Sequence, residues 1–91
     1  MSEEKSPYKV GNAYLFRCVT SYQIGRVEYV TKKEIVLSGA GWCADTGRFE
    51  EALRTGVVSE YEPAPDGFCI VGRGALVDAF NWNHEIPREV K

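Results

Sequence analysis

The stretch that decides the fold runs from residue 13 to residue 20 and reads AYLFRCVT. It is rich in aromatic and β-branched residues, which favour strands over helices. Its side chains alternate between two faces of an extended chain, with Tyr14, Phe16 and Cys18 on one face and Leu15, Arg17 and Val19 on the other. The stretch therefore predicts a strand that is buried on at least one side.

Two further strands follow this one. The segment 21–30 carries Ile24, Val27 and Val30 around Gly25, and a glycine inside a strand pattern indicates a bulge or a close backbone approach. A polar turn at 31–33 leads into a third strand at 34–38. Because the connections are short, the first forty residues predict a three-stranded antiparallel meander.

The period of the apolar residues then changes. Phe49, Ala52 and Leu53 recur at helical spacing within 46–55, acidic residues stand in the first turn, and Gly56 follows as a stop signal. Prolines make 59–67 a predicted loop, and 68–71 and 75–80 are predicted strands. The order of elements predicts an α+β fold, a small bent antiparallel sheet or partly open β-barrel of about five strands with one short helix. We expect residues 1–11 to be a flexible leader and residues 12–91 to form a single domain.

Composition excludes several classes of protein. A chain of 91 residues leaves no room for a second domain. The net charge is −2, and neither half of the chain is basic enough to hold duplex nucleic acid. No apolar run is long enough to span a membrane. The three cysteines form no C-x-x-C pair, so we expect reduced thiols, no metal and a cytoplasmic location.

The sequence predicts that the protein is not an enzyme and uses no cofactor. It has a single histidine, His84, and no recognisable hydrolase, metalloprotease or phosphate-loop motif. Glu50 and Glu51 are adjacent on the predicted helix, so their side chains point about 100° apart. Two carboxylates in this arrangement cannot act together as a catalytic pair. Among the cysteines, only Cys43 stands near a helix start and an arginine that could lower the pKa of its thiol.

The best candidate site is the corner between the third strand and the helix. Backbone N–H groups at a helix start can hold an anion, here at Thr46 and Gly47, with Arg48 as the neighbouring cation and Trp42 as a stacking surface for a base. Arg26, a strand arginine that could converge on this corner, completes the candidate ligand-binding set. The alternative is that Asp45, Thr46 or Gly47 simply caps the helix.

Two other features are open to interpretation. Residues 39–44 match the dinucleotide-binding pattern G-x-G-x-x-A, but the short elements around them favour a simple strand-to-helix turn. Trp82 has polar neighbours, so we expect its ring to seal the edge of the core or to lie in a subunit contact or ligand pocket. Together with the short core, this setting predicts a homo-oligomer.

The layout resembles an uncharacterised family of short phage and prophage proteins over roughly residues 13–80. The resemblance is carried by the first strand, the strand at 34–37, the Ala/Gly/Trp corner at 40–42, the Gly-x-Phe helix start at 47–49 and Gly56. Small phage accessory proteins act against bacterial defence, some by sequestering a cyclic nucleotide signal as an oligomeric sponge and others by occupying a defence protein.

The resemblance implies an anti-defence protein in the host bacterial cytoplasm. Its ligand would be a cyclic nucleotide or another small anion, held by Trp42, Thr46, Gly47, Arg48 and Arg26. The alternative is a protein-binding inhibitor of a defence component, or a structural accessory protein. In that case the second half of the chain, which has 9 acidic residues against 5 basic ones from Asp45 onward, would face a basic partner.

Overall fold

The computed structural model describes residues 6–91, and the first five positions of the predicted leader lie outside the described residues. Its elements follow the predicted order with two additions, a strand after the helix and a 3-10 turn before the last strand. They are β1 (Ala13–Cys18), β2 (Tyr22–Val30), β3 (Glu34–Asp45), α1 (Phe49–Thr55), β4 (Glu60–Pro63), β5 (Cys69–Gly72), the 3-10 turn η1 (Arg73–Ala75) and β6 (Leu76–Asn81).

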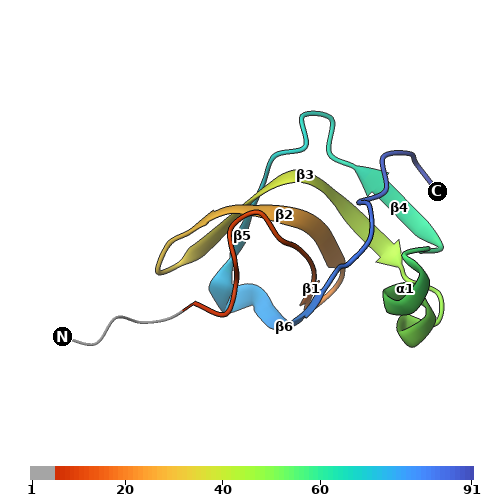
Figure 1. The fold of residues 1–91 in the computed structure, drawn as a ribbon, viewed down its shortest axis with the longest axis horizontal. Coiled ribbons are helices and arrows are strands. Elements are labelled where there is room, and N and C mark those ends of the chain that lie inside the picture. Colours follow the sequence, from red (N-terminus) through yellow and green to blue (C-terminus); the bar gives the residue numbers. More distant parts are fainter. Residues whose placement is uncertain (1–5) are drawn as a thin grey trace.

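The strands form one antiparallel sheet of six strands (Figure 1), in the order β4-β3-β2-β1-β6, with β5 also paired to β3. The predicted meander of the first three strands is confirmed. After η1 the chain returns to pair β6 with β1, which bends the sheet without closing it. The count of about five strands was too low by one, because the region predicted as a loop contains β4.

Strand β3 is longer than predicted and provides a common edge for two partners. Residues 34–37 pair with β5, and residues 41–45 pair with β4. The segment 39–44, which the sequence suggested as a turn, therefore stays within the strand. Gly41 fits there because the ring of Tyr61 lies against it, so closely that an added Cβ would stand 2.1 Å from the Tyr61 hydroxyl.

The predicted close approach at Gly25 is also present. The register between β2 and β3 shifts between Ile24 and Arg26, and a Cβ on Gly25 would stand 2.9 Å from the side chain of Leu37. The glycine therefore leaves room at this register shift for the side chain of Leu37 to pack against the backbone of β2.

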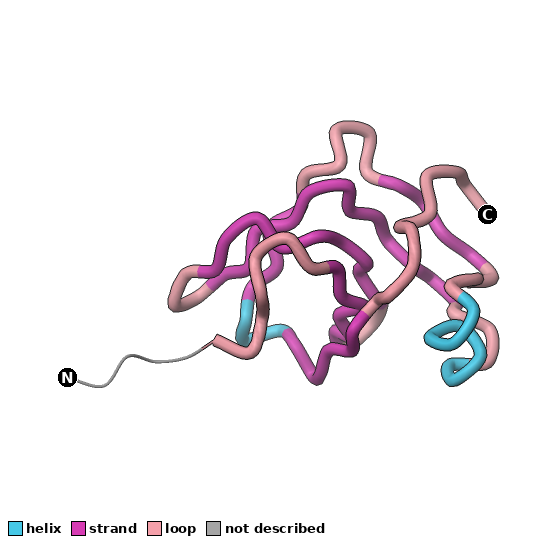
Figure 2. Tube along the Cα trace, in the orientation of Figure 1, coloured by secondary structure: helices cyan, strands magenta, loops and turns pink. Residues whose placement is uncertain are grey.

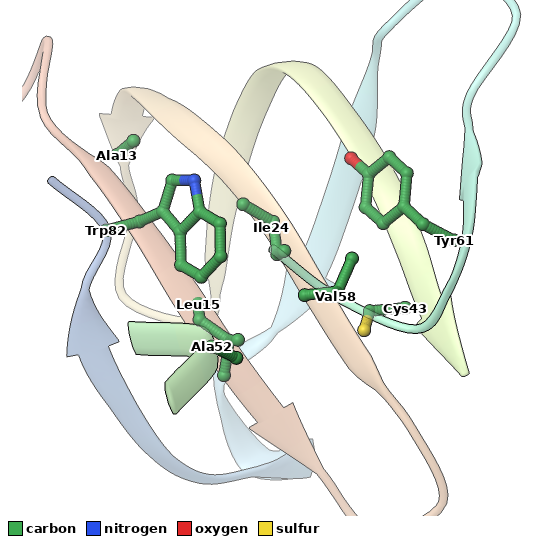
Figure 3. Packing of buried hydrophobic residues seen from close by; sticks show 8 residues of the cluster. All are labelled: Ala13, Leu15, Ile24, Cys43, Ala52, Val58, Tyr61 and Trp82. Atoms are coloured by element: carbon green, nitrogen blue, oxygen red, sulfur yellow. The ribbon is translucent and has the colours of Figure 1, made fainter. Parts of the chain in front are cut away.

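One face of the sheet packs on a cluster built from strands alone, here called the all-strand cluster. Its buried members are Tyr14, Phe16, Val27, Ile35, Leu37, Ala40 and Val71. The opposite face carries the helix-side cluster (Figure 3), whose members are Ala13, Leu15, Ile24, Cys43, Ala52, Val58, Tyr61 and Trp82. The alternation along β1 thus matches the sequence pattern, and this strand is buried on both faces.

Helix α1 begins later than predicted. Its N-cap is Arg48, which makes no side-chain capping bond, so the expectation that Asp45, Thr46 or Gly47 caps the helix was wrong. The predicted stop is confirmed, because Gly56 has a left-handed backbone with φ of +79° and its N–H donates to the carbonyl of Ala52.

The described part of the predicted leader contacts the sheet. The Tyr8 ring meets the Tyr14 ring edge-on at a centroid distance of 5.5 Å, and the Gly11 N–H donates to the carbonyl of Val27 at 2.8 Å. Residues 8–11 therefore lie along the all-strand cluster before β1 begins.

Candidate functional site

The predicted corner around Thr46 forms a tight turn with its own hydrogen bonds. The Gly47 N–H donates to the Asp45 carboxylate at 2.8 Å, and the Thr46 hydroxyl donates to the Gly47 carbonyl at 3.0 Å. Thr46 is buried and Arg48 is exposed. A carboxylate therefore already occupies one of the amides that the sequence assigned to a phosphate.

Trp42 lies within β3, three residues before the strand ends at Asp45. Its cross-strand neighbours are Gln23 on β2 and Glu62 on β4, and its side chain is 44% exposed. It lines a hollow of about 270 Å³, which we call the aromatic slot, with Gln23, Glu62, Pro63, Pro65 and Phe68 among the other lining residues. Neither Thr46 nor Arg48 lines this slot.

Arg26 lines a larger hollow between the sheet and the C-terminal segment. This hollow of about 530 Å³, which we call the arginine groove, is also lined by Ser38, Ala40, Glu85, Ile86 and Arg88. One guanidinium nitrogen of Arg26 donates to the carbonyl of Gly11 at 2.8 Å, which directs the side chain across the start of β1. Within residues 6–91, no ion pair engages Arg26 or Arg88.

A second hollow adjoins the arginine groove and shares Arg26 and Glu85 with it. This asparagine hollow of about 440 Å³ is also lined by Asn12, Asn81, Asn83 and His84. Its amide side chains can both donate and accept hydrogen bonds. Arg26 thus stands between a cationic groove and a hollow rich in amides.

Trp42 and Arg26 lie on opposite faces of the sheet. Trp42 pairs across the strands with Gln23, and Gln23 pairs with Phe16 of the all-strand cluster. Arg26 instead pairs with Ala13 of the helix-side cluster. Cross-strand partners share a face, so one small ligand cannot touch both side chains. The five residues of the predicted site are therefore spread over three places, which are the turn, the aromatic slot and the arginine groove.

The segment that follows β6 runs as a loop to the C-terminus (Figure 2) and supplies Glu85, Ile86 and Arg88 to the lining of the arginine groove. Trp82 is 2% exposed, its indole N–H donates to the carbonyl of Glu85 at 3.1 Å, and its backbone N–H donates to the carbonyl of Ala13. His84 Nε2 lies 2.7 Å from the carbonyl of Leu53 in the last turn of α1. Of the roles expected for Trp82, the structure shows that its ring seals the edge of the core, and Trp82 also lines the asparagine hollow, as the pocket alternative expected.

The far end of this segment is also tied to the sheet. The backbone groups of Lys91 exchange two hydrogen bonds with those of Tyr61, at 2.8 and 3.1 Å. Residues 85–88, which carry Glu85, Ile86 and Arg88 into the groove, are therefore held at both ends. Figure 1 shows this segment passing between the sheet and α1 towards β4.

The cysteines offer no activated thiol. All three lie in the described part of the chain and are unpaired, and Cys43 is buried. Burial raises the pKa of the Cys43 thiol, and this outweighs the lowering by a backbone hydrogen bond at Asp45. The expectation that the helix start could lower the pKa of Cys43 was therefore wrong, because the thiol points into the helix-side cluster.

Two groups of residues that line the hollows were not singled out as site residues from the sequence. Arg88 and the asparagines have no motif around them, and they line hollows with Arg26 only because the C-terminal segment folds back over β2 and β3.

Within residues 6–91 no group of three or more histidine, cysteine or acidic side chains is placed to hold a metal ion. Over the same residues, no helix is long and apolar enough to cross a membrane.

Comparisons with protein families, with curated proteins and with solved structures found no match for this chain. The resemblance to phage accessory proteins therefore stays a prediction, and the case for a function rests on the geometry of the groove.

Proposed function

We propose that this protein is a non-enzymatic binding protein that sequesters a small anionic ligand of the cyclic nucleotide class in the arginine groove. One observation carries the proposal. Arg26 and Arg88, which are 62 positions apart in the sequence, line the same groove without an ion pair to a carboxylate among residues 6–91. Guanidinium groups bind phosphate through two parallel hydrogen bonds, so two of them on one groove form a binding site for an anion.

The neighbouring hollow supports a nucleotide over a simple anion. A phosphate between Arg26 and Arg88 would leave the rest of the ligand beside Asn12, Asn81 and Asn83. Amide side chains match the donor and acceptor pattern on the edge of a base. Glu85 lines both hollows and would accept a hydrogen bond from a sugar hydroxyl.

This proposal moves the predicted ligand site while keeping one of its residues. The turn at Thr46, Gly47 and Arg48 is less suited to a phosphate, because the Asp45 carboxylate would repel it. With the resemblance to phage proteins, the groove leads us to propose an anti-defence sponge that acts in the host cytoplasm.

The test is a panel of cyclic mononucleotides and dinucleotides, screened by thermal shift and followed by calorimetry. Losing one charged hydrogen-bonding group costs about 1.5–3 kcal/mol, so R26Q and R88Q should each weaken binding by roughly tenfold or more. R54Q is the matched control, because Arg54 lies on the exposed face of α1 and contacts Glu50 at 3.2 Å.

The R48Q variant distinguishes the groove from the predicted corner. Unchanged affinity in R48Q with weak binding in R26Q and R88Q supports the groove. The reverse pattern would place the ligand at the corner, and a panel without any binder would overturn the proposal.

We also propose that the chain forms a homo-oligomer. Among residues 6–91, β5 pairs with β3 alone and β6 pairs with β1 alone, so within this part of the chain both strands have an unpaired edge. Exposed apolar side chains lie on or beside these strands, among them Ile70 and Val77, each more than half exposed. Free strand edges next to apolar surface favour pairing with another chain. Sedimentation at micromolar concentration tests this, and a strictly monomeric mass would contradict it.

A further inference from the structure

The aromatic slot lies on the other face of the sheet from the arginine groove and is built from a different kind of side chain. Trp42 is 44% exposed and Phe68 is 54% exposed, so two large aromatic rings border the slot in contact with solvent. Pro63 and Pro65 supply further apolar surface. Exposed aromatic groups that gather around a hollow mark an interaction site more often than scattered ones do.

The slot is preformed, because both of its sides are fixed by the backbone. Trp42 lies in β3 between two paired strands. The loop that carries Phe68 is bound to Ala40, whose N–H donates to the Gly67 carbonyl at 2.8 Å and whose carbonyl accepts from the Ala64 N–H at 2.9 Å. The Phe68 N–H donates to the Asp66 carboxylate at 3.0 Å. Binding of a partner would therefore cost little conformational entropy in the slot, because its residues are already ordered.

The charge around the slot has one sign. Glu62, the cross-strand neighbour of Trp42, is the charged residue among those that line it. Glu60 and Asp66 are exposed on the same strand and the same loop, and no lysine or arginine among residues 6–91 lines the slot. A cation over the face of a tryptophan is attracted by the ring, and a carboxylate beside it adds to that attraction. The slot therefore complements a positively charged group.

We propose that the aromatic slot docks an arginine or lysine side chain from an extended basic segment of a partner protein. Such a side chain has an apolar stem, which would lie against Pro63 and Pro65, and a charged end, which would lie over Trp42 beside Glu62. A hollow of about 270 Å³ accommodates one side chain, so the partner offers an extended segment and not a broad folded surface. The charged end would lie on the other face of the sheet from Arg26, although Pro63, Ala64 and Pro65 line both the slot and the arginine groove.

The test uses a dye-labelled peptide in which arginine alternates with glycine, and measures its binding by fluorescence anisotropy. The control peptide carries citrulline, a neutral isostere, in place of arginine. We expect the citrulline peptide to bind at least tenfold more weakly. W42L and E62Q should each weaken binding of the arginine peptide by about fivefold or more, since they remove the ring and the charge separately.

Matched variants separate the slot from general effects of charge and apolar surface. E51Q removes an exposed carboxylate on α1, and Y29L removes a ring that is 55% exposed on β2, so both should bind the arginine peptide like the unmodified chain. If W42L fails to fold, as judged by circular dichroism, F68L replaces it. Equal binding of both peptides, equal losses in E51Q and E62Q, or no binding of the arginine peptide would each overturn the proposal. Loss of self-association in W42L without peptide binding would also overturn it, because the occupant would then be a second copy of this chain.

Discussion

The two faces of the sheet are closed in different ways. Six buried members of the all-strand cluster come from the meander β1–β3 and one, Val71, comes from β5, while the helix-side cluster also needs α1, Val58, Tyr61 and Trp82, which lie outside the meander. The first cluster therefore depends mainly on the meander, and the second draws half of its members from later segments of the chain. Because Trp82 also anchors the wall of the arginine groove, packing in the helix-side cluster determines the shape of the candidate site.

The largest loss of stability is expected for a substitution of Trp82, which the C-terminal segment contributes to the helix-side cluster. W82A removes a ring that is 2% exposed and should lower the free energy of unfolding by about 3–5 kcal/mol, as truncation of a buried aromatic does. Urea denaturation measures this, with F16A in the all-strand cluster as the reference. If W82A cost less than about 1 kcal/mol while F16A cost several, the C-terminal segment would not be part of the core.

A second variant tests the contact between Gly41 and Tyr61. In G41A the new methyl group would stand 2.1 Å from the Tyr61 hydroxyl, so the ring must move, at a cost of about 1–3 kcal/mol. The cost should be smaller in a Y61L background, because the obstructing ring is absent there. Equal costs in both backgrounds, measured by urea denaturation, would show that the ring does not limit this position.

Because of Tyr61, we also expect the stability of the protein to depend on pH in the alkaline range. The Tyr61 hydroxyl is buried without a hydrogen-bond partner among the described residues, and burial raises the pKa of Tyr61 to about 12. The unfolded chain gives up this proton near its ordinary pKa of about 10, so stability is full below pH 10 and falls as the pH rises towards 12.

Y61F isolates this effect. Between pH 10 and 12 the unmodified chain should lose up to about 1.4 kcal/mol per pH unit more than Y61F does, as followed by thermal denaturation. Parallel stability curves for the two proteins over this range would contradict the prediction.

The smallest change in stability is expected for the ion pair between Arg17 and Asp78, which lies outside both clusters. Arg17 on β1 donates to the Asp78 carboxylate on β6 at 2.8 and 2.5 Å, and this hydrogen bond and charge lower the pKa of Asp78. Both side chains are well exposed to solvent, which screens such a pair. R17Q should leave the urea midpoint at pH 7 unchanged within error, and a large drop would show that this edge of the sheet depends on the ion pair.

The sequence was most informative where structure depends on near neighbours. The alternation of residues 13–18, the close approach at Gly25 and the stop at Gly56 follow from side-chain size and backbone freedom, and all three were predicted. Strand β4 was missed because its Pro63 reads as a loop residue, while the strand forms by pairing with β3. This pairing is tertiary and leaves no local signal.

The candidate site was harder to predict for the same reason. Trp82 has polar neighbours in the sequence, but its ring points into the helix-side cluster. The polarity of the neighbouring residues therefore did not indicate that the Trp82 side chain is buried. Arg88 joins Arg26 only through the path of the C-terminal segment. The turn at Gly47 looked suited to an anion because the side chain of Asp45 could equally have pointed elsewhere.

The double pairing of β3 has a consequence for how such a chain can diverge. Since β5 pairs with residues 34–37 and β4 with residues 41–45 on the same edge, residues 46–68 form an excursion between two strands that would otherwise be a simple hairpin. The excursion carries α1, β4 and the loop that borders both the arginine groove and the aromatic slot. Substitutions within it would change the lining of both hollows while the pairing of β1, β2, β3, β5 and β6 stays intact, so these two surfaces and the fold can diverge at different rates.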